Sequence, residues 1–240
     1  VSLVSEEKSE LVPQAYDLTE LQRDANIALG FSAKETLDTL QRLYEVHKIV
    51  TYPRTDSRCI TPDIVPTLTE RIKALSGTIF SRQVDEYLQN GYKNDNPRFV
   101  DASAVSDHHA IIPTEETVHV EKLSKNEEKL WQLIAMRFLE VLGEDYKYKT
   151  TTAVIDVDGK NFKTRLTLPV SKGYRSVAES SAMKSASPIV EDMDNSFAIM
   201  RMKEGDEVDL LSVRVRKSTT TPPERYTDAT LLSAMEHAGR

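Results

Sequence analysis

Residues 51–58 read TYPRTDSR and gather a phenol, a guanidinium, a carboxylate and several hydroxyl groups into eight consecutive positions. Pro53 fixes its own backbone and biases Tyr52 toward an extended conformation, so a turn or the end of a strand is predicted here. Arg54 offers a planar set of donors that matches phosphate oxygens, which favours phosphate chemistry. The alternative is a surface turn in which Arg54 pairs with Asp56 and Tyr52 is half buried.

Tyr52 is the candidate nucleophile of this segment. A phenol reacts poorly at neutral pH unless a positive charge favours its ionised form, and Arg54 could supply that charge while holding the phosphate. In an extended segment Tyr52, Arg54 and Asp56 share one face, because side chains repeat with a period of two. Attack on a phosphodiester would give a phosphotyrosine, which conserves the energy of the broken bond, so resealing needs no nucleotide cofactor.

A second polar segment, residues 106–114, reads SDHHAIIPT and places two adjacent histidines before an apolar triplet. His108 or His109 could hydrogen-bond to a phosphate oxygen or transfer a proton. A metal pair is the rival interpretation, but no third ligand lies at a recognisable spacing, so no metal site is predicted. For at least one of the two histidines, a loop position without a function remains the alternative.

Helix-capping signals place both segments in a helical block that spans residues 17–143. The predicted helix ends are, in chain order, Asp17 with Glu20 and then Gly30, Ser32 with Glu35, and Ser124 with Glu127 and then Gly143. The first two helices form a helical hairpin or a helix-turn-helix-like unit, for which ordinary core packing is the alternative. A short strand is predicted over residues 49–52, a helix from residues 61–63 to residues 76–77, and further helix within residues 78–90.

A β-rich block is predicted over residues 144–215, and an edge strand over residues 1–16. The other predicted elements are strands over 150–157, 161–169, 197–202 and 206–215, a hairpin turn at Asp158-Gly159, a loop over 178–192, a linker over 218–223 and a helix from Thr227. Residues 216–240 thus form a linker and the start of a further helical part. If the first strand pairs with the later block, the fold is α+β, with a helical domain inserted into a β-rich domain.

The composition describes a globular chain with an acidic balance. Hydrophobic residues make up 39% of the 240 residues and the formal net charge is −7, which argues against a basic coat for nonspecific nucleic-acid binding but permits a local basic groove. No apolar run approaches the ~20 residues of a membrane span, and the N-terminus lacks a signal-peptide pattern. Cys59 is the one cysteine, so we expect a cytoplasmic protein without membrane contact. The chain begins without methionine, which favours a fragment.

Three ordered motifs resemble those of the type IA DNA topoisomerases. They are TYPRTDSR, SDHHAIIPT and, near the C-terminus, PPERYTDATLLSAMEHAG. The preceding run YDLTELQRDANIALGFSAKETLDTLQRLYE is similar to the family along its length. The form HHAIIPT is closer to bacterial topoisomerase III than to topoisomerase I, and the resemblance covers nearly the whole chain.

The resemblance implies a role for each matching residue. Tyr52 matches the tyrosine that attacks single-stranded DNA and becomes joined to the 5′ phosphate, Arg54 matches an arginine at the scissile phosphate, and His108 matches a histidine that assists there. Further DNA contacts are expected at Gln41, Glu45, Thr55, Asp56, Arg58 and His109. The helical block corresponds to the movable domain that bears the tyrosine, and the β-rich block to part of the arch that lets this domain lift during strand passage.

The sequence departs from the family in one respect. The family's active site is completed by a Toprim domain with a glutamate, a lysine and an acidic cluster for Mg²⁺, and no such motif occurs here. We therefore expect Mg²⁺ only in the full-length enzyme, with no cofactor in this chain, which would be inactive in isolation. The expected partners are single-stranded DNA and the remaining domains, in the bacterial cytoplasm at the nucleoid. The alternative is a non-catalytic module that binds single-stranded DNA or acts as a scaffold.

Overall fold

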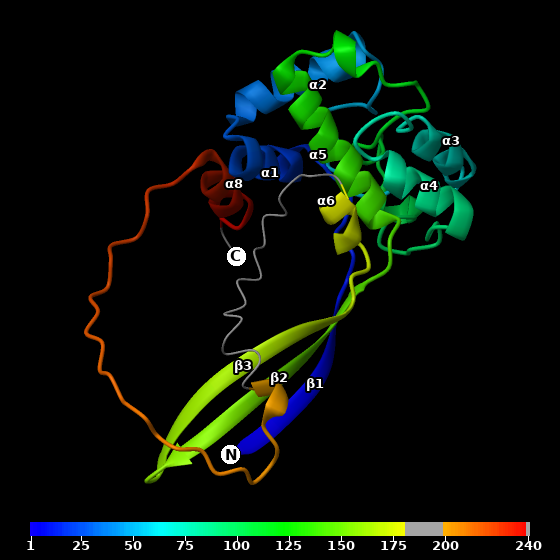
Figure 1. The fold of residues 1–240 in the computed structure, drawn as a ribbon. Coiled ribbons are helices and arrows are strands. Elements are labelled where there is room, and N and C mark those ends of the chain that lie inside the picture. The colour runs from blue at the N-terminus through cyan, green and yellow to red at the C-terminus, as the bar shows by residue number, and fades with distance from the viewer. Residues whose placement is uncertain (181–198, 239–240) are drawn as a thin grey trace. The chain divides into compact units, whose positions relative to one another are not determined.

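Strands from distant parts of the sequence form an antiparallel sheet (Figure 1). In a computed structural model, which describes residues 1–180 and 199–238, β1 (Ser2–Glu10) pairs with β2 (Tyr146–Val157), and β2 pairs with β3 (Lys160–Ser171). The helices α1 to α5 lie in sequence between β1 and β2. The prediction of an α+β fold, with a helical part inserted between strands of one sheet, is therefore confirmed.

The β2–β3 hairpin forms where the sequence predicts it. Asp158 and Gly159 adopt φ angles of 51° and 77°, the left-handed conformation that a two-residue hairpin turn requires and that an Asp-Gly pair supplies at low cost. Val157 and Lys160 are the first paired residues on either side of the turn. Ala153 on β2 and Leu166 on β3 pack with Ile199 in a small apolar cluster.

Two strands predicted after β3 are wrong. Residues 199–201 are helical, and residues 197–198 lie outside the described part. Residues 206–215 form no regular element, and the side chains of Leu211 and Val215 are 93% and 92% exposed. An alternating apolar pattern marks a strand only where a neighbouring strand accepts its hydrogen bonds, and none of the described strands does so here.

The described residues fall into two compact units. The sheet unit contains residues 1–11, 145–173 and 199–224, and the helical unit contains residues 12–144, 174–180 and 225–238. None of the described helices is long and apolar enough to cross a bilayer.

The first two helices begin and end at the predicted residues. α1 (Leu18–Leu29) is capped by Asp17, whose Oδ1 accepts a hydrogen bond from the Glu20 backbone N–H at 2.6 Å. It ends at Gly30, which adopts a φ of 74°. Ser32 caps α2 (Ala33–Glu45) in the same way. A side-chain oxygen at this position satisfies a backbone N–H that the first turn leaves free.

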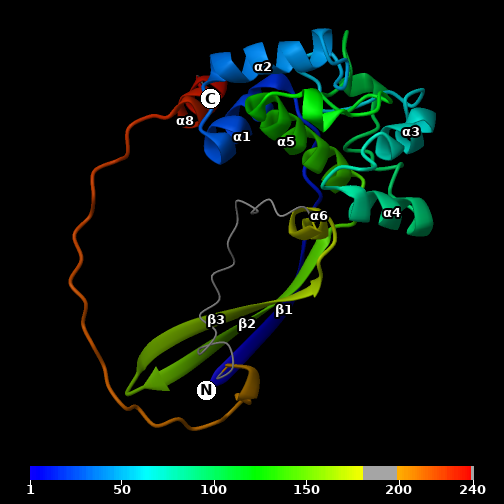
Figure 2. The same cartoon turned by 45° about the horizontal axis from the view of Figure 1, so that its top comes forward.

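α5 (Lys125–Val141) is the central helix of the helical unit. It begins with the predicted capping box of Ser124 and Glu127, and it lies with α1 and α2 on one side and α3 and α4 on the other (Figures 1 and 2). Trp131, Ile134 and Phe138 on α5 are almost fully buried in the main core. This core holds the loops that carry the candidate site.

The remaining helices differ in part from the prediction. α3 (Leu68–Lys73) follows a 3₁₀ turn at Val65–Thr67, so the predicted start at residues 61–63 is wrong. Pro66 lies in that turn, and it lacks the N–H that an α-helix would need at this point. The other elements are α4 (Ser81–Asn90), 3₁₀ turns at Ala102–Ala104 and Val120–Lys122, α6 (Arg175–Ser180) and α8 (Asp228–Glu236).

Of the C-terminal predictions, the loop is wrong where α6 lies, and the helix that begins at Thr227 is confirmed as α8. α6 includes residues 178–180, which were predicted as part of a loop; the rest of that loop, residues 181–192, lies outside the described residues. α8 begins after Thr227, whose hydroxyl oxygen accepts from the Thr230 backbone N–H, so the predicted helix start is confirmed.

Candidate active site around Tyr52

Residues 51–58 belong to no helix or strand, and the backbone bends at Pro53 and Arg54. Pro53, Thr55 and Ser57 are buried, whereas Arg54 and Asp56 are exposed and Tyr52 is half buried. This alternation follows the period of two of extended backbone. Tyr52, Arg54 and Asp56 therefore share the outward face.

The segment that contains the two histidines holds this segment in place. The Thr51 backbone N–H donates to the Ile112 carbonyl at 3.0 Å, and the Thr51 hydroxyl donates to the Ala110 carbonyl at 2.8 Å. The predicted strand at residues 49–52 is wrong, since Val50 and Pro113 form only an isolated bridge. Pro113 has no N–H to extend the ladder, and the Thr51 hydroxyl bonds where a second backbone pair would lie.

The Tyr52 ring contacts two other rings. Its centroid is 4.1 Å from that of the His108 ring, at an interplanar angle of 33°, and 5.6 Å from that of Tyr44, at 87°. Tyr44 comes from α2 and was not among the predicted site residues. Its place on the apolar stripe of α2 was visible in the sequence, but the tertiary contact with Tyr52 was not. These aromatic contacts restrict the orientation of the Tyr52 phenol.

Arg54 is available to an anion from outside the protein. Within the described part of the chain its guanidinium has no hydrogen-bond or ion-pair partner, so the alternative Arg54–Asp56 pair is not formed. Asp56 instead accepts a hydrogen bond from the Ser106 hydroxyl at 3.4 Å. Arg54 opens into a pocket of about 480 Å³, which is also lined by Asp17, Leu18, Thr19, Leu37, Thr55, Asp56 and Glu236. An unpaired guanidinium in an open pocket suits a phosphate group.

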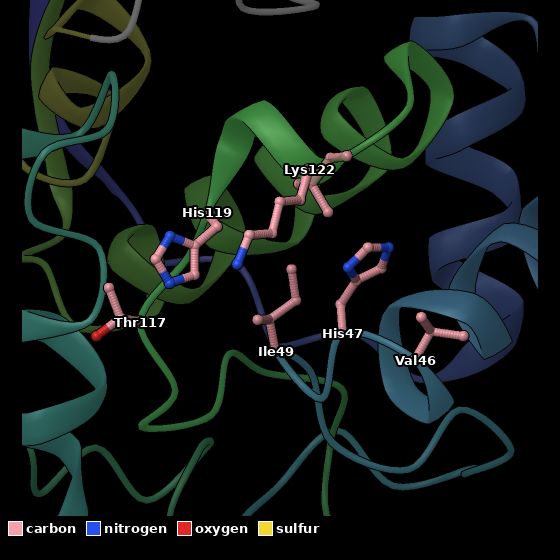
Figure 3. Close-up of a pocket in the computed structure, with 7 residues that line it drawn as sticks. Val46, His47, Ile49, Thr117, His119 and Lys122 are labelled. Carbon is pink, nitrogen blue, oxygen red and sulfur yellow. The ribbon is translucent and has the colours of Figure 1, made fainter.

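Three other residues predicted to contact DNA lie on α2 or beside His108. Gln41 and Glu45 are on α2, half buried and exposed respectively, one turn apart and next to the Tyr44 contact. His109 is half buried, and its Nδ1 is buried without a hydrogen-bond partner among the described residues. A separate pocket beside the end of α2 holds two further histidines, His47 and His119 (Figure 3).

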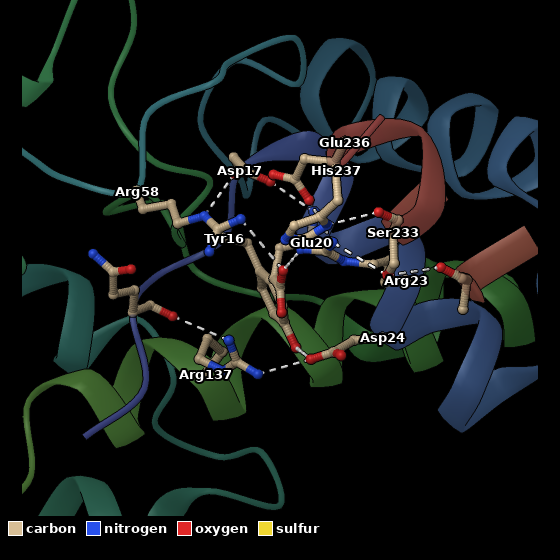
Figure 4. Close-up of polar contacts among 12 residues, drawn as sticks. Tyr16, Asp17, Glu20, Arg23, Asp24, Arg58, Arg137, Ser233, Glu236 and His237 are labelled. Atoms are coloured by element: carbon tan, nitrogen blue, oxygen red, sulfur yellow. Dashed lines mark hydrogen bonds and ion pairs between the residues drawn. The ribbon is translucent and has the colours of Figure 1, made fainter. Parts of the chain in front are cut away.

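The side chains of Thr55 and Arg58 form hydrogen bonds within the protein instead of pointing outward with Arg54 and Asp56. Thr55 is 7% exposed, and its hydroxyl donates to the His108 carbonyl at 3.1 Å. Arg58 donates from Nε to Asp17 Oδ2 at 2.6 Å and from Nη2 to Glu20 Oε2 at 3.3 Å (Figure 4). Both side chains thereby fix the backbone on either side of Asp56.

Ion pairs connect the Glu20 carboxylate to α8 through Arg23. Glu20 also pairs with Arg23, whose Nη1 lies 2.6 Å from Glu236 Oε2 of α8 (Figure 4). The N-terminal end of α8 is held as well, because the Ala33 backbone N–H donates to Asp228 Oδ2 at 2.9 Å. The Ala229 backbone N–H donates to the side-chain oxygen of Asn26. α8 is therefore attached to α1 and to the start of α2 by polar contacts.

A buried polar network supports the site from behind. The Tyr16 hydroxyl donates to Asp24 at 2.7 Å, and Arg137 donates to the same carboxylate at 2.7 Å while its guanidinium lies 4.2 Å from the Tyr16 ring centre (Figure 4). Burial raises the pKa of Tyr16 well above its usual range. The Tyr16 carbonyl accepts from the Ile111 N–H at 2.8 Å. The network thus anchors the segment that contains His108, and no local sequence pattern indicates it.

The site offers no metal-binding constellation. Among residues 1–180 and 199–238, no group of three or more histidine, cysteine or carboxylate side chains could hold a metal ion. The residues described here therefore provide no such set of ligands for Mg²⁺.

Comparisons with known proteins match this chain over nearly its whole length. A sequence family described as DNA topoisomerase matches residues 1–239. The DNA topoisomerase 3 of Bacillus licheniformis is 42% identical over 237 residues, which cover 99% of this chain and 32% of that protein. The DNA topoisomerase 3 of Bacillus subtilis is 42% identical over 230 residues, which cover 96% and 31%. The chain spans about a third of the length of these curated relatives.

A solved structure shares the fold. The full-length topoisomerase I of Thermotoga maritima superposes with a TM-score of 0.68 at 25% sequence identity. The superposition covers 99% of this chain and 37% of the Thermotoga chain.

Proposed function

The chain belongs to the DNA topoisomerase family, and on this premise we propose that it carries the nucleophile of a type IA topoisomerase, Tyr52. The observation that supports this most directly is the Tyr52 phenol, which lies against the His108 ring at 4.1 Å and shares its face with the unpaired Arg54. The similarity to bacterial DNA topoisomerase 3 favours that branch of the family.

The proposed reaction exchanges one phosphoester bond for another. The Tyr52 oxygen loses its proton to solvent and attacks the phosphorus of single-stranded DNA. The bond from phosphorus to the 3′ oxygen breaks, that oxygen takes a proton from water, and the 5′ phosphate stays on Tyr52. Attack by the 3′ hydroxyl on the phosphotyrosine reverses each step and reseals the strand without a nucleotide cofactor.

Arg54 and His108 act on the phosphate in this proposal. The guanidinium binds the non-bridging oxygens, where negative charge builds up during attack. His108, whose ring lies against that of Tyr52, hydrogen-bonds to a phosphate oxygen. Thr55 and Arg58 position the backbone through their internal bonds.

The DNA strand is proposed to continue along the outward face. We propose four further DNA contacts. Gln41 and Glu45 lie on α2 beside Tyr44, and Asp56 and His109 lie in the segments that contain Tyr52 and His108.

The remaining functions belong to the complete enzyme. Because the chain spans about a third of its relatives' length, we propose that the residues that bind Mg²⁺ lie in another part of the enzyme, a Toprim domain. The sheet unit would form part of an arch that lets the helical unit lift, so that a DNA strand passes through and DNA is relaxed or decatenated. The enzyme would act on DNA in the bacterial cytoplasm, at the nucleoid.

A covalent-adduct assay tests the assignment of Tyr52. The chain is mixed with a separately expressed Toprim portion of the enzyme, labelled single-stranded DNA and Mg²⁺, and a denaturing gel is searched for DNA joined to protein. Adduct is expected with the unaltered chain and with Tyr226→Phe, whose exposed tyrosine lies outside the site. Adduct formation by Tyr52→Phe would show that another residue is the nucleophile.

A salt titration separates the alternative of a module that only binds DNA. Binding of a single-stranded oligonucleotide is measured by fluorescence anisotropy at several salt concentrations. The proposal expects affinity to fall with salt, because phosphate contacts release counterions, and the fall to be less steep in Arg54→Ala. Salt-dependent binding without any adduct would favour the non-catalytic module.

A further inference from the structure

A small pocket beside the C-terminal end of α2 plays no part in the proposed reaction. It has a volume of about 180 Å³ and is lined by Val46, His47, Ile49, Thr117, His119, Lys122 and Leu123. At roughly 30 Å³ per water molecule, this volume holds the equivalent of about six waters. It therefore has room for a tetrahedral oxyanion with part of its hydration shell.

The polar groups that line the pocket are donors or potential cations. Figure 3 shows the Lys122 side chain extending over Ile49 between the rings of His119 and His47. One ring nitrogen of His47 is turned toward this space, and the other is turned away. None of the lining residues is a carboxylate. The pocket thus combines an ammonium group and two imidazoles over an apolar floor.

Two carboxylates lie near the pocket, each within 3.5 Å of one of its histidines. Glu127 lies 3.5 Å from His47 Nε2, but it also accepts from Arg42 Nε at 2.7 Å and from the Ser124 N–H at 2.7 Å. Glu121 lies 3.2 Å from His119 Nδ1 and is exposed. Lys122 has no carboxylate partner in the part of the chain that the structure describes. An anion would therefore meet an uncompensated ammonium group in the pocket.

We propose that this pocket, formed by His47, His119 and Lys122, binds a phosphate group. The group is supplied either by the backbone of a DNA strand or by a free phosphate compound, since the same donors suit both. Ile49, on the floor of the pocket, precedes Tyr52 by three residues, so their Cα atoms are at most about 11 Å apart. A strand held at Tyr52 could thus place a neighbouring phosphate here.

The binding itself is tested with inorganic phosphate. The ring signals of the histidines are followed by ¹H–¹⁵N correlation NMR of the 240-residue chain during a phosphate titration. His47 and His119 are expected to shift along a saturating curve in the unaltered chain and in Lys125→Ala, which removes an exposed lysine outside the pocket. Lys122→Ala is expected to weaken the apparent affinity at least fivefold, and Lys122→Arg to restore most of it.

The titration also separates this site from the proposed catalytic one. His108 reports on the Tyr52 site, so a shift of His108 without one of His47 and His119 would overturn the proposal for the pocket while leaving the proposed function intact. Equal affinities for Lys122→Ala and Lys125→Ala would overturn it as well.

A second arm identifies the source of the phosphate. Anisotropy of a labelled single-stranded oligonucleotide is measured across salt for the same variants. If the DNA backbone supplies the group, Lys122→Ala lowers the slope of log affinity against log salt by about 0.7, and Lys125→Ala leaves it unchanged. If oligonucleotide binding is the same in both variants while inorganic phosphate still saturates the histidine shifts, the pocket binds a free phosphate compound.

Discussion

Replacing Glu140 with glutamine is expected to remove a pH-dependent loss of stability. Glu140 is 8% exposed on α5, and its Oε2 lies 3.4 Å from Arg137 Nε. Burial raises the pKa of Glu140 to about 7, since the attraction of Arg137 is too weak to offset desolvation and the repulsion of Asp24.

The direction of the effect follows from where the proton is bound. In the unfolded chain the carboxyl returns to its ordinary pKa of 4.5. Between that value and about 7 the folded chain holds a proton that the unfolded chain has released, so the free energy of unfolding falls as the pH rises through this window. A difference of about 2.5 pKa units corresponds to about 3 kcal/mol at most.

Urea denaturation at pH 5 to 8 measures this contribution. Trp131, the one tryptophan, is fully buried on the same helix, so its fluorescence reports unfolding of the helical unit. The difference in unfolding free energy between the unaltered chain and Glu140→Gln is expected to shift by about 2.5 kcal/mol in favour of the variant as the pH rises from 5 to 8. Glu86→Gln, at an exposed position of α4, is the matched control. A difference that stays constant over this range would refute the reasoning.

Three further predictions concern single side chains of the helical unit. At Glu127 burial raises the pKa, but hydrogen bonds from Ser124 and the Arg42 guanidinium outweigh it and lower the pKa to about 2. The stabilising contribution of the Glu127 carboxylate is present above pH 4.5 and is lost as the pH falls toward 2. Glu127→Gln should therefore lower the free energy of unfolding at pH 7, and the stabilities of the variant and the unaltered chain should converge in an acid titration followed by circular dichroism. Parallel curves would contradict this. Phe138→Ala should cost about 3–5 kcal/mol in urea denaturation because it empties a fully buried site, and a cost below ~1 kcal/mol would mean that the core collapses into the space. Gly30→Ala should cost about 1–2 kcal/mol in thermal denaturation because its φ of 74° is left-handed, whereas an unchanged midpoint would show that α1 can end differently.

Local signals explain which parts of the fold could be predicted. The N-caps Asp17, Ser32, Ser124 and Thr227 and the Asp158-Gly159 turn were found because each depends on a few neighbouring residues. The strand expected over residues 206–215 depends on a hydrogen-bonded partner, which no local pattern reports. The start of α3 was misplaced because the proline at 62 suggested a first turn before the proline at 66.

The candidate site divides in the same way. The motifs predicted that Tyr52 and His108 belong together, and the structure brings their rings to 4.1 Å. Tyr44 and the buried Tyr16–Asp24–Arg137 network were missed, because these contacts form only when helices distant in sequence pack together. Hydrophobic periodicity identifies which residues are buried, but not which buried polar side chains meet.

The attachment of α8 to α1 is in effect a binding equilibrium within one molecule. The polar contacts include the Arg23–Glu236 ion pair, the Asp228 carboxylate on the Ala33 N–H, and the Asn26 side chain on the Ala229 N–H. A tether gives the two surfaces an effective concentration on the order of 1 mM, so a contact with a dissociation constant of about 1 mM between separate molecules would be formed about half the time. Modest changes in ionic strength or in one charge could then shift the attached fraction substantially, and the helix would rebind without having to diffuse back from bulk solution.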